Sequence, residues 1–257
     1  MATVNEKMTA IANNIRDKTG GTEALTLDDM ASGVNEVYEA GKFAEKDKFW
    51  EDALKNGVSA MSFSGNAWND DTFQPTRNIW CQNGNNGNWF FSDNKITSVK
   101  KALAIHNVNF DTKNLTGLSY AFNNLITTDL PELDFSKVKD TKRFDNGFKN
   151  NANLITVDKI MLTENWTSIS SFGNFMAGNS KLENVIFEGV IPATISFSSS
   201  PLSVESIKNI ITHLKDYSGT DNEYTITFNG VAFCALGEEE IEWVRIIISK
   251  KWNLVMA

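Results

Sequence analysis

The residues of this chain that could do binding chemistry recur as two spaced rows of mostly polar side chains. The first row is Ser98, Thr127, Thr156 and Asn184, and the second is Lys100, Asp129, Asp158 and Ile186. If each row comes from neighbouring strands about 4.8 Å apart, Asp129 and Asp158 are adjacent like charges that need solvent or a bridging cation. We expect this strip to contact a glycan or a surface protein, and an ordinary solvated sheet face is the alternative.

Aromatic residues give a second group of candidates. Residues 58–95 are rich in Gly, Asn and aromatic side chains, and Trp68 and Trp89 are the rings chosen as ligand-binding candidates. Their indoles could stack on sugars, or they could fill the core, which is the more common use of such rings. The adjacent Asp70 and Asp71 point in different directions, which favours a solvated loop over a metal site.

No catalytic motif is present in the sequence. There is no nucleophile elbow, phosphate loop, dinucleotide fingerprint or zinc-protease helix, and His106 and His213 lie far apart. Cys81 and Cys234 lack the spacing of a zinc site or a disulfide framework, and the acids at 238–240 are typical of a helix start. We therefore expect a protein that is not an enzyme and uses no cofactor or metal.

Composition limits the possible partners. The chain has 257 residues, is 41% hydrophobic and 22% charged, and carries a formal net charge of −8. Such an acidic chain matches neither a nucleic-acid backbone nor an anionic membrane surface. The first residues do not read as a secretion signal, and no stretch reads as a membrane span, so we expect assembly in the bacterial cytoplasm and no membrane insertion.

An internal repeat must position the two rows. An apolar pattern starts at Ile96, Leu125, Leu154 and Leu182, a step of about 28–29 residues. A second column, Leu115, Phe144 and Phe172, keeps nearly the same step. The pattern predicts stacked units that bury their apolar faces against one another, with Thr128 pointing inward and Thr127 outward.

The segments 109–122 and 133–138, followed by Phe144 and Phe148, resemble the BspA-like leucine-rich repeats of bacterial surface proteins. The resemblance implies an α+β fold in which an N-terminal helical arm precedes a short irregular leucine-rich-repeat solenoid with a helical C-terminal cap. The predicted domains are the arm at 1–57 and the repeat domain at 58–257. The latter divides into an N-terminal cap (58–95), repeats (96–200) and a C-terminal cap (201–257). In that cap the pattern predicts a helix starting at Ser203, a strand at 224–228, a second helix and a last strand at 252–255.

Helical spacing predicts two helices in the arm, at 4–17 and about 27–55. The second has one apolar stripe, so either it associates with other chains or it folds back on residues 58–95. The stretch Ile11–Met30 is similar to the N-terminal motif of many tail and baseplate-associated proteins of phages and prophages. This resemblance implies attachment of the chain to a virion.

Together these patterns predict a viral tail protein for host attachment. Its arm docks onto other tail proteins or forms a homo-oligomer, for which tail-fibre analogy favours a trimer, and its repeat domain binds a host-surface protein or glycan as receptor. The alternatives are a purely structural tail component and, in a different class, a polysaccharide-degrading tail enzyme.

Overall fold

The structure is a computed structural model, and it describes positions 13, 65, 68–73, 79–80, 91–105, 110–111, 118–136, 144–164, 172 and 174–257. The chain divides into two compact units, Met1–Asn56 and Gly57–Ala257. In the first unit only Asn13 is described, as an exposed helical residue. Apart from Asn13, the arm helices predicted at 4–17 and about 27–55 lie outside the described residues.

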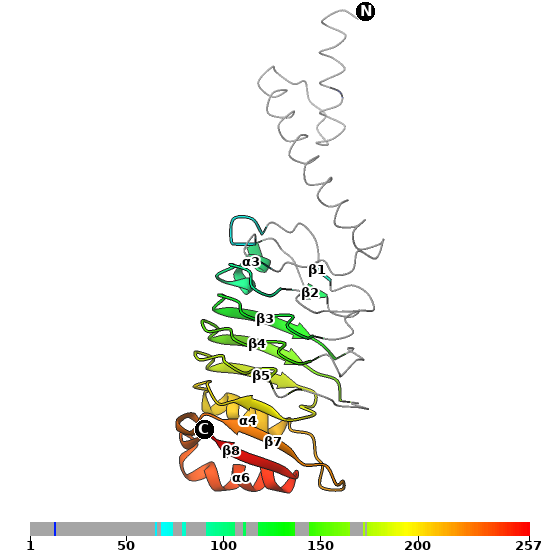
Figure 1. Cartoon of the computed structure of the whole chain (residues 1–257), viewed down its shortest axis with the longest axis vertical. Coiled ribbons are helices and arrows are strands. Elements are labelled where there is room, and N and C mark those ends of the chain that lie inside the picture. The colour runs from blue at the N-terminus through cyan, green and yellow to red at the C-terminus, as the bar shows by residue number, and fades with distance from the viewer. Residues whose placement is uncertain are drawn as a thin grey trace, which may run out of the picture. The chain divides into compact units, whose positions relative to one another are not determined.

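Short strands and a few helices make up this unit (Figure 1). In chain order they are β1 (Ile79–Trp80), α3 (Val99–Ile105), β2 (Phe110–Asp111), β3 (Asp129–Asp134), β4 (Thr156–Met161), β5 (Asn184–Glu188), β6 (Ile195–Phe197), α4 (Val204–Thr212), β7 (Tyr224–Phe228), α5 (Gly230–Cys234), the 3₁₀ helix η2 (Gly237–Glu239), α6 (Glu240–Ser249) and β8 (Trp252–Met256). All the strand pairs are parallel, and β1 pairs with β2.

The predicted leucine-rich-repeat solenoid is wrong as a description of this architecture. The described residues form an α+β arrangement with two small three-stranded parallel sheets, β3-β4-β5 and β6-β7-β8, and few helices. The α+β class agrees with the prediction, but β5 and β6 do not pair, so the strands do not form one continuous stack. The strand pairing is also uneven, because the register shifts between Val157 and Ile160.

The break between the sheets has a local cause in α4. The amides of Val185 and Phe187, on the edge of β5 that faces away from β4, donate to Ser206 Oγ at 3.0 Å and Asn209 Oδ1 at 2.7 Å. Both acceptors are side chains of α4. Backbone amides that already have partners cannot pair with a further strand, so the first sheet ends at β5.

Within the first sheet the strand offset is close to the repeat read from the sequence. Asp129 pairs with Thr156 and Val157 with Val185, offsets of 27 and 28 residues. All the residues predicted to point inward are buried except Thr128, which is exposed. Its neighbour Thr127, predicted to point outward, is fully buried. Thr127 lies inside because its hydroxyl accepts the amide of Val99 at 3.0 Å and donates to the carbonyl of Asp129 at 2.8 Å.

The core is a column of phenylalanine rings. Successive ring centroids along Phe73, Phe91, Phe122, Phe148 and Phe175 are 5.6, 6.1, 4.9 and 5.0 Å apart. Phe144 and Phe172, which the sequence placed in one column, stack at 5.6 Å, and Leu115 lies outside the described residues. Such ring pairs contribute beyond their buried area, so the rings join units that are far apart in sequence.

Buried asparagines follow the same repeat. We call Asn94, Asn123, Asn151 and Asn179 the asparagine ladder; they are 29, 28 and 28 residues apart and all are buried. Asn151 shows their role: its Oδ1 accepts the amide of Leu125 at 2.7 Å, and its Nδ2 donates to the carbonyls of Phe122 and Phe148, both at 2.9 Å.

The closing elements follow the sequence closely. Ser203 caps α4 by accepting the amide of Ser206 at 3.3 Å, as its position before an apolar helical repeat predicts. Leu214 just beyond α4 and three isoleucines of the helix (207, 210 and 211) are buried. Asn229, directly after β7, is the N-cap of α5, with its Oδ1 accepting the amide of Ala232 at 3.1 Å.

Candidate functional site

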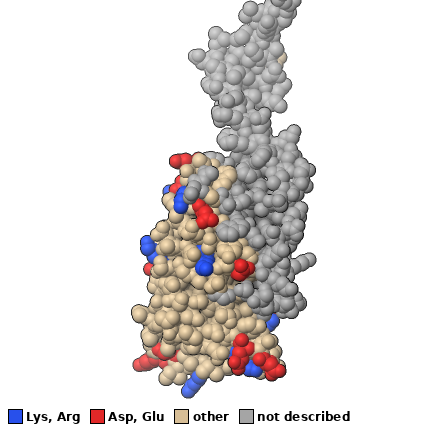
Figure 2. Space-filling model, in the orientation of Figure 1, with Lys and Arg blue, Asp and Glu red and all other residues tan. Residues whose placement is uncertain are grey.

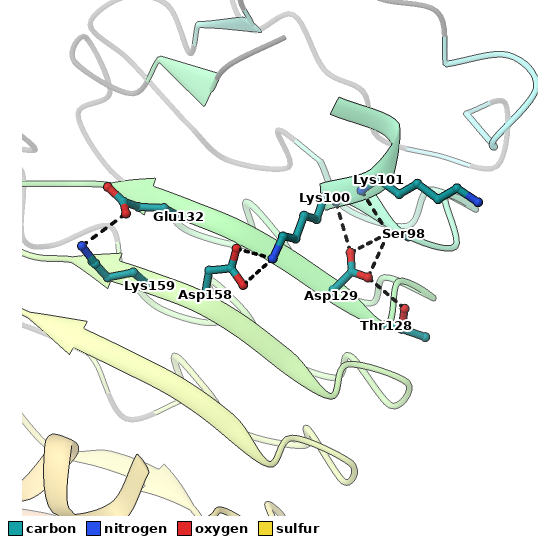
Figure 3. Close-up of polar contacts among 8 residues, drawn as sticks. All are labelled: Ser98, Lys100, Lys101, Thr128, Asp129, Glu132, Asp158 and Lys159. Atoms are coloured by element: carbon teal, nitrogen blue, oxygen red, sulfur yellow. Dashed lines mark hydrogen bonds and ion pairs between the residues drawn. The ribbon is translucent and has the colours of Figure 1, made fainter. Parts of the chain in front are cut away.

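The candidate site is the outward side of the first sheet, together with the start of α3 that lies beside it (Figure 3). We call this surface the sheet face. It is made of the residues of β3, β4 and β5 that do not enter the core: Asp129, Pro131, Glu132, Asp134, Thr156, Asp158, Lys159, Met161, Asn184, Ile186 and Glu188. Parallel strands in register place these side chains in rows across the sheet.

Asp129 closes the N-terminus of α3. Its carboxylate accepts the hydroxyl of Ser98 at 2.7 and 2.9 Å and the amide of Lys100 at 3.1 Å. Ser98 Oγ accepts the amide of Lys101 at 3.0 Å, and Thr127 accepts that of Val99. The first amides of a helix lack partners within the helix, so Ser98, Thr127 and Asp129 tie α3 to β3.

Lys100 separates the two aspartates that the sequence placed side by side. Its Nζ lies 2.9 Å from Oδ1 and 2.8 Å from Oδ2 of Asp158. The hydrogen bond and the charge of Asp158, with a smaller contribution from Asp129, raise the pKa of Lys100. The predicted like-charge pair is therefore wrong: Asp129 pairs with Thr156 across the sheet, which places Asp158 two residues further along β4, where the lysine neutralises it.

A row of alternating charge crosses the sheet at its other end. Lys159 Nζ lies 3.2 Å from a carboxylate oxygen of Glu132 on β3 and 3.2 Å from one of Glu188 on β5. The hydrogen bonds that Lys159 donates to both glutamates raise its pKa. These residues were missed because the rows were drawn with the average repeat step, whereas these residues are 27 and 29 apart. Solvent-exposed pairs of this kind stabilise little, but they hold three charged side chains in a fixed order.

The remaining predicted residues divide between positions on and off the sheet face. Thr156 and Asn184 pair across the strands, as their row predicts. Ile186 is half-buried on the same face, whereas Thr127 is buried beneath it. Trp68 is half-buried with its ring edge-on to Phe73 at 6.5 Å, at the end of the phenylalanine column.

Two further sequence predictions concern individual residues. Trp89 lies outside the described residues, so the structure says nothing of its ring. Asp70 accepts both the amide and the hydroxyl of Thr97, at 2.9 and 2.6 Å. The predicted solvated loop is thus also a contact between segments 27 residues apart.

The chemistry available to the sheet face is recognition by charge and hydrogen bonding. Among the described residues, no group of three or more His, Cys, Asp or Glu side chains could hold a metal ion. His213 Nδ1 lies 2.8 Å from the carbonyl of Asn209 in α4, away from these acids. In the same part of the chain, no helix is long and apolar enough to cross a membrane.

Charged side chains also occur outside the sheet face, as in the ion pair of Lys208 and Glu239. In the view of Figure 2, acidic and basic side chains lie in small mixed groups with uncharged surface between them. Comparisons with protein-family models, curated proteins and solved structures found no match.

Proposed function

We propose that this chain is a non-enzymatic, tail-associated protein of a phage or prophage. Its N-terminal segment attaches to the virion or joins copies of the chain, and its second unit binds a protein or glycan on the host surface. The motif at Ile11–Met30 supports the virion attachment. The arrangement that supports binding is the row Glu132–Lys159–Glu188, held across three paired strands.

The charge of this row narrows the kind of receptor. Glu132, Asp134 and Glu188 are exposed, and Lys159 is the basic residue that β3, β4 and β5 contribute to this face. The exposed carboxylate oxygens can accept hydrogen bonds, and charge-assisted bonds to them are stronger than neutral ones. The fitting receptor group therefore offers N–H or O–H donors, as a basic protein surface, an amino sugar or a hydroxyl-rich glycan does.

The test is binding of the fluorescently labelled full chain to a panel of bacterial cells. Converting both Glu132 and Glu188 to Gln keeps their shape but removes the charge that the row presents. We expect cell binding to fall at least about tenfold, since a charge-assisted bond contributes roughly 1.5–3 kcal/mol. Glu205→Gln, at an exposed position of α4, is the matched control. Equal binding by the double variant and the control would refute the role of the row.

A purely structural tail component is the second candidate, because Asp129 and Asp158 are already engaged within the fold. Truncation at Gly57, where the second unit begins, separates the two functions. If the second unit binds a receptor, the truncated chain still binds to cells. If the chain is purely structural, the truncated chain does not bind to cells. Asp129 and Asp158 are poor test positions, since changing Asp129 would also loosen α3.

A further inference from the structure

The last strand, β8, has one edge that no other strand pairs with in the described part of the chain. Ala257, directly after β8, donates its amide to Phe228 at 3.0 Å and accepts the amide of Gly230 at 2.9 Å. Its backbone therefore faces β7. Because alternate residues of a strand bond to opposite sides, Asn253 and Val255 also face β7, and the backbone groups of Trp252, Leu254 and Met256 face away from it.

At both outer edges of the first sheet, backbone amides donate hydrogen bonds to other parts of the chain. On β5 the outward amides of Val185 and Phe187 donate to α4 side chains. Just before β3, the amide of Thr128 donates to the carbonyl of Thr97 at 2.9 Å. An open edge is a template for pairing with another chain, and proteins usually cover or charge it. β8 thus differs from both edge strands of the first sheet.

β8 also lacks the features that protect open edges. Its sequence, Trp-Asn-Leu-Val-Met, contains no charge and no proline, and it pairs with β7 without a bulge. Val255 is 44% exposed and Met256 52% exposed. Five of the seven exposed large apolar side chains in the described part of the chain lie between Val231 and Met256. Val255 and Met256 lie on β8 itself, and exposed apolar side chains on an open edge strand favour association with another chain.

We propose that β8 pairs antiparallel with β8 of a second copy of this chain, about a twofold axis. A twofold interface needs a surface that complements itself, and this strand meets that condition. With Leu254 on the axis, its outward N–H and C=O meet those of Leu254 of the second copy, and Trp252 lies opposite Met256. Asn253 then lies opposite Val255, and no like charges meet across the strand pair.

The consequence is one continuous sheet formed from β6-β7-β8 of both copies. The outward backbone groups of β8 gain hydrogen-bond partners, and Val255 loses part of its exposure to water. This interface lies in the second unit and uses none of the N-terminal residues. It therefore adds to any association through the first unit and does not depend on the proposed receptor binding.

The first test is sedimentation equilibrium of the full chain and of two variants. Val255→Lys places a charge beside the axis, and Ile155→Lys makes the same change at an exposed apolar residue before β4. We expect wild type and Ile155→Lys to have twice the mass of Val255→Lys at the same concentration. The N-terminal segment is the same in all three proteins, so any association that it adds is common to them. A Val255→Lys mass equal to that of wild type would overturn the proposal, as would a monomeric wild type.

A second test determines which residues of the two β8 strands lie opposite each other, by disulfide cross-linking, and does not require a variant that weakens the interface. In a background with Cys81 and Cys234 replaced by Ser, one preparation carries Asn253→Cys and another Val255→Cys. In the proposed pairing, residue 253 of one copy lies opposite residue 255 of the other without sharing hydrogen bonds, so their Cα atoms are about 4.5 Å apart, within reach of a disulfide. The two copies of residue 253 are diagonal neighbours at roughly 7–8 Å, which is too far for a disulfide. We expect disulfide-linked dimers on oxidation of the mixture and not of either variant alone. No dimer in the mixture, or as much in either single variant, would contradict the proposed pairing.

Discussion

Replacing Asn151 with Ala should strongly destabilise the second unit. The side chain is fully buried and bonds to the amide of Leu125 and to the carbonyls of Phe122 and Phe148. Alanine removes the side-chain partner of each of these three buried backbone groups. A buried backbone group that loses its partner costs about 1–3 kcal/mol. At about 1–2 kcal/mol for each of the three groups, the lower part of that range, we expect a loss of roughly 3–6 kcal/mol, a large share of the 5–15 kcal/mol of a typical domain.

Urea unfolding followed by circular dichroism measures this loss. With a slope of about 2 kcal/mol per molar urea, the midpoint should fall by about 1.5–3 M. Asn153→Ala is the control, because Asn153 is only half-buried and accepts one bond, from Lys181 at 3.1 Å. Its midpoint should move by no more than about 0.25 M, as for an ordinary surface change. If the two variants shift the midpoint equally, the asparagine ladder does not hold the units together as argued.

Three further changes test other contacts. Gly189→Ala should lower the melting temperature by roughly 5–10 °C, because φ is +81° and a Cβ would lie 1.9 Å from the carbonyl oxygen of Leu162; Gly219→Ala, with open space around it, should melt as wild type does, and similar melting of both variants would argue against this steric reason. Lys250→Met removes an ammonium that donates to three carbonyls at 2.6–3.0 Å at the end of α4, and should cost about 1–3 kcal/mol in urea unfolding; an unchanged midpoint would show that these bonds add nothing. Burial raises the pKa of Tyr217, so the stability that its neutral phenol contributes is present below the ordinary tyrosine pKa of about 10 and is lost as pH rises above it. The ultraviolet absorbance of tyrosinate should therefore show this residue ionising only when the protein unfolds, and ionisation in the folded protein would contradict the assignment.

The parts of the fold that the sequence predicted are those fixed by local patterns. Ser203 begins α4, the alternation at 224–228 forms β7, and Phe144 stacks on Phe172. Capping, strand alternation and apolar spacing are properties of short windows, so a single sequence carries them.

The errors concern relations between windows. Thr128 was predicted to point inward because it fits the small position of the repeat pattern, and a one-residue error of this kind exchanges it with Thr127. The assumed step of 28–29 residues put Asp158 beside Asp129 and hid the row through Lys159, because β3 and β4 pair with an offset of 27 residues. The end of the first sheet at β5 depends on two polar side chains of α4, Ser206 and Asn209, whose partners are about 20 residues away in sequence. No local pattern marks such a contact.

The asparagine ladder also has a mechanical consequence. The side chain of Asn151 bonds to Leu125 and Phe122 of the preceding repeat, and its backbone amide donates to Asn179 Oδ1 of the following repeat at 2.9 Å. A pull along the stacking direction would load these side-chain bonds together with the strand pairs, so that no unit can be peeled off by breaking backbone bonds alone. For a protein held at one end and bound to a cell at the other, this cross-linking would resist tearing during attachment. Stretching single molecules should then give lower rupture forces for Asn151→Ala than for Asn153→Ala.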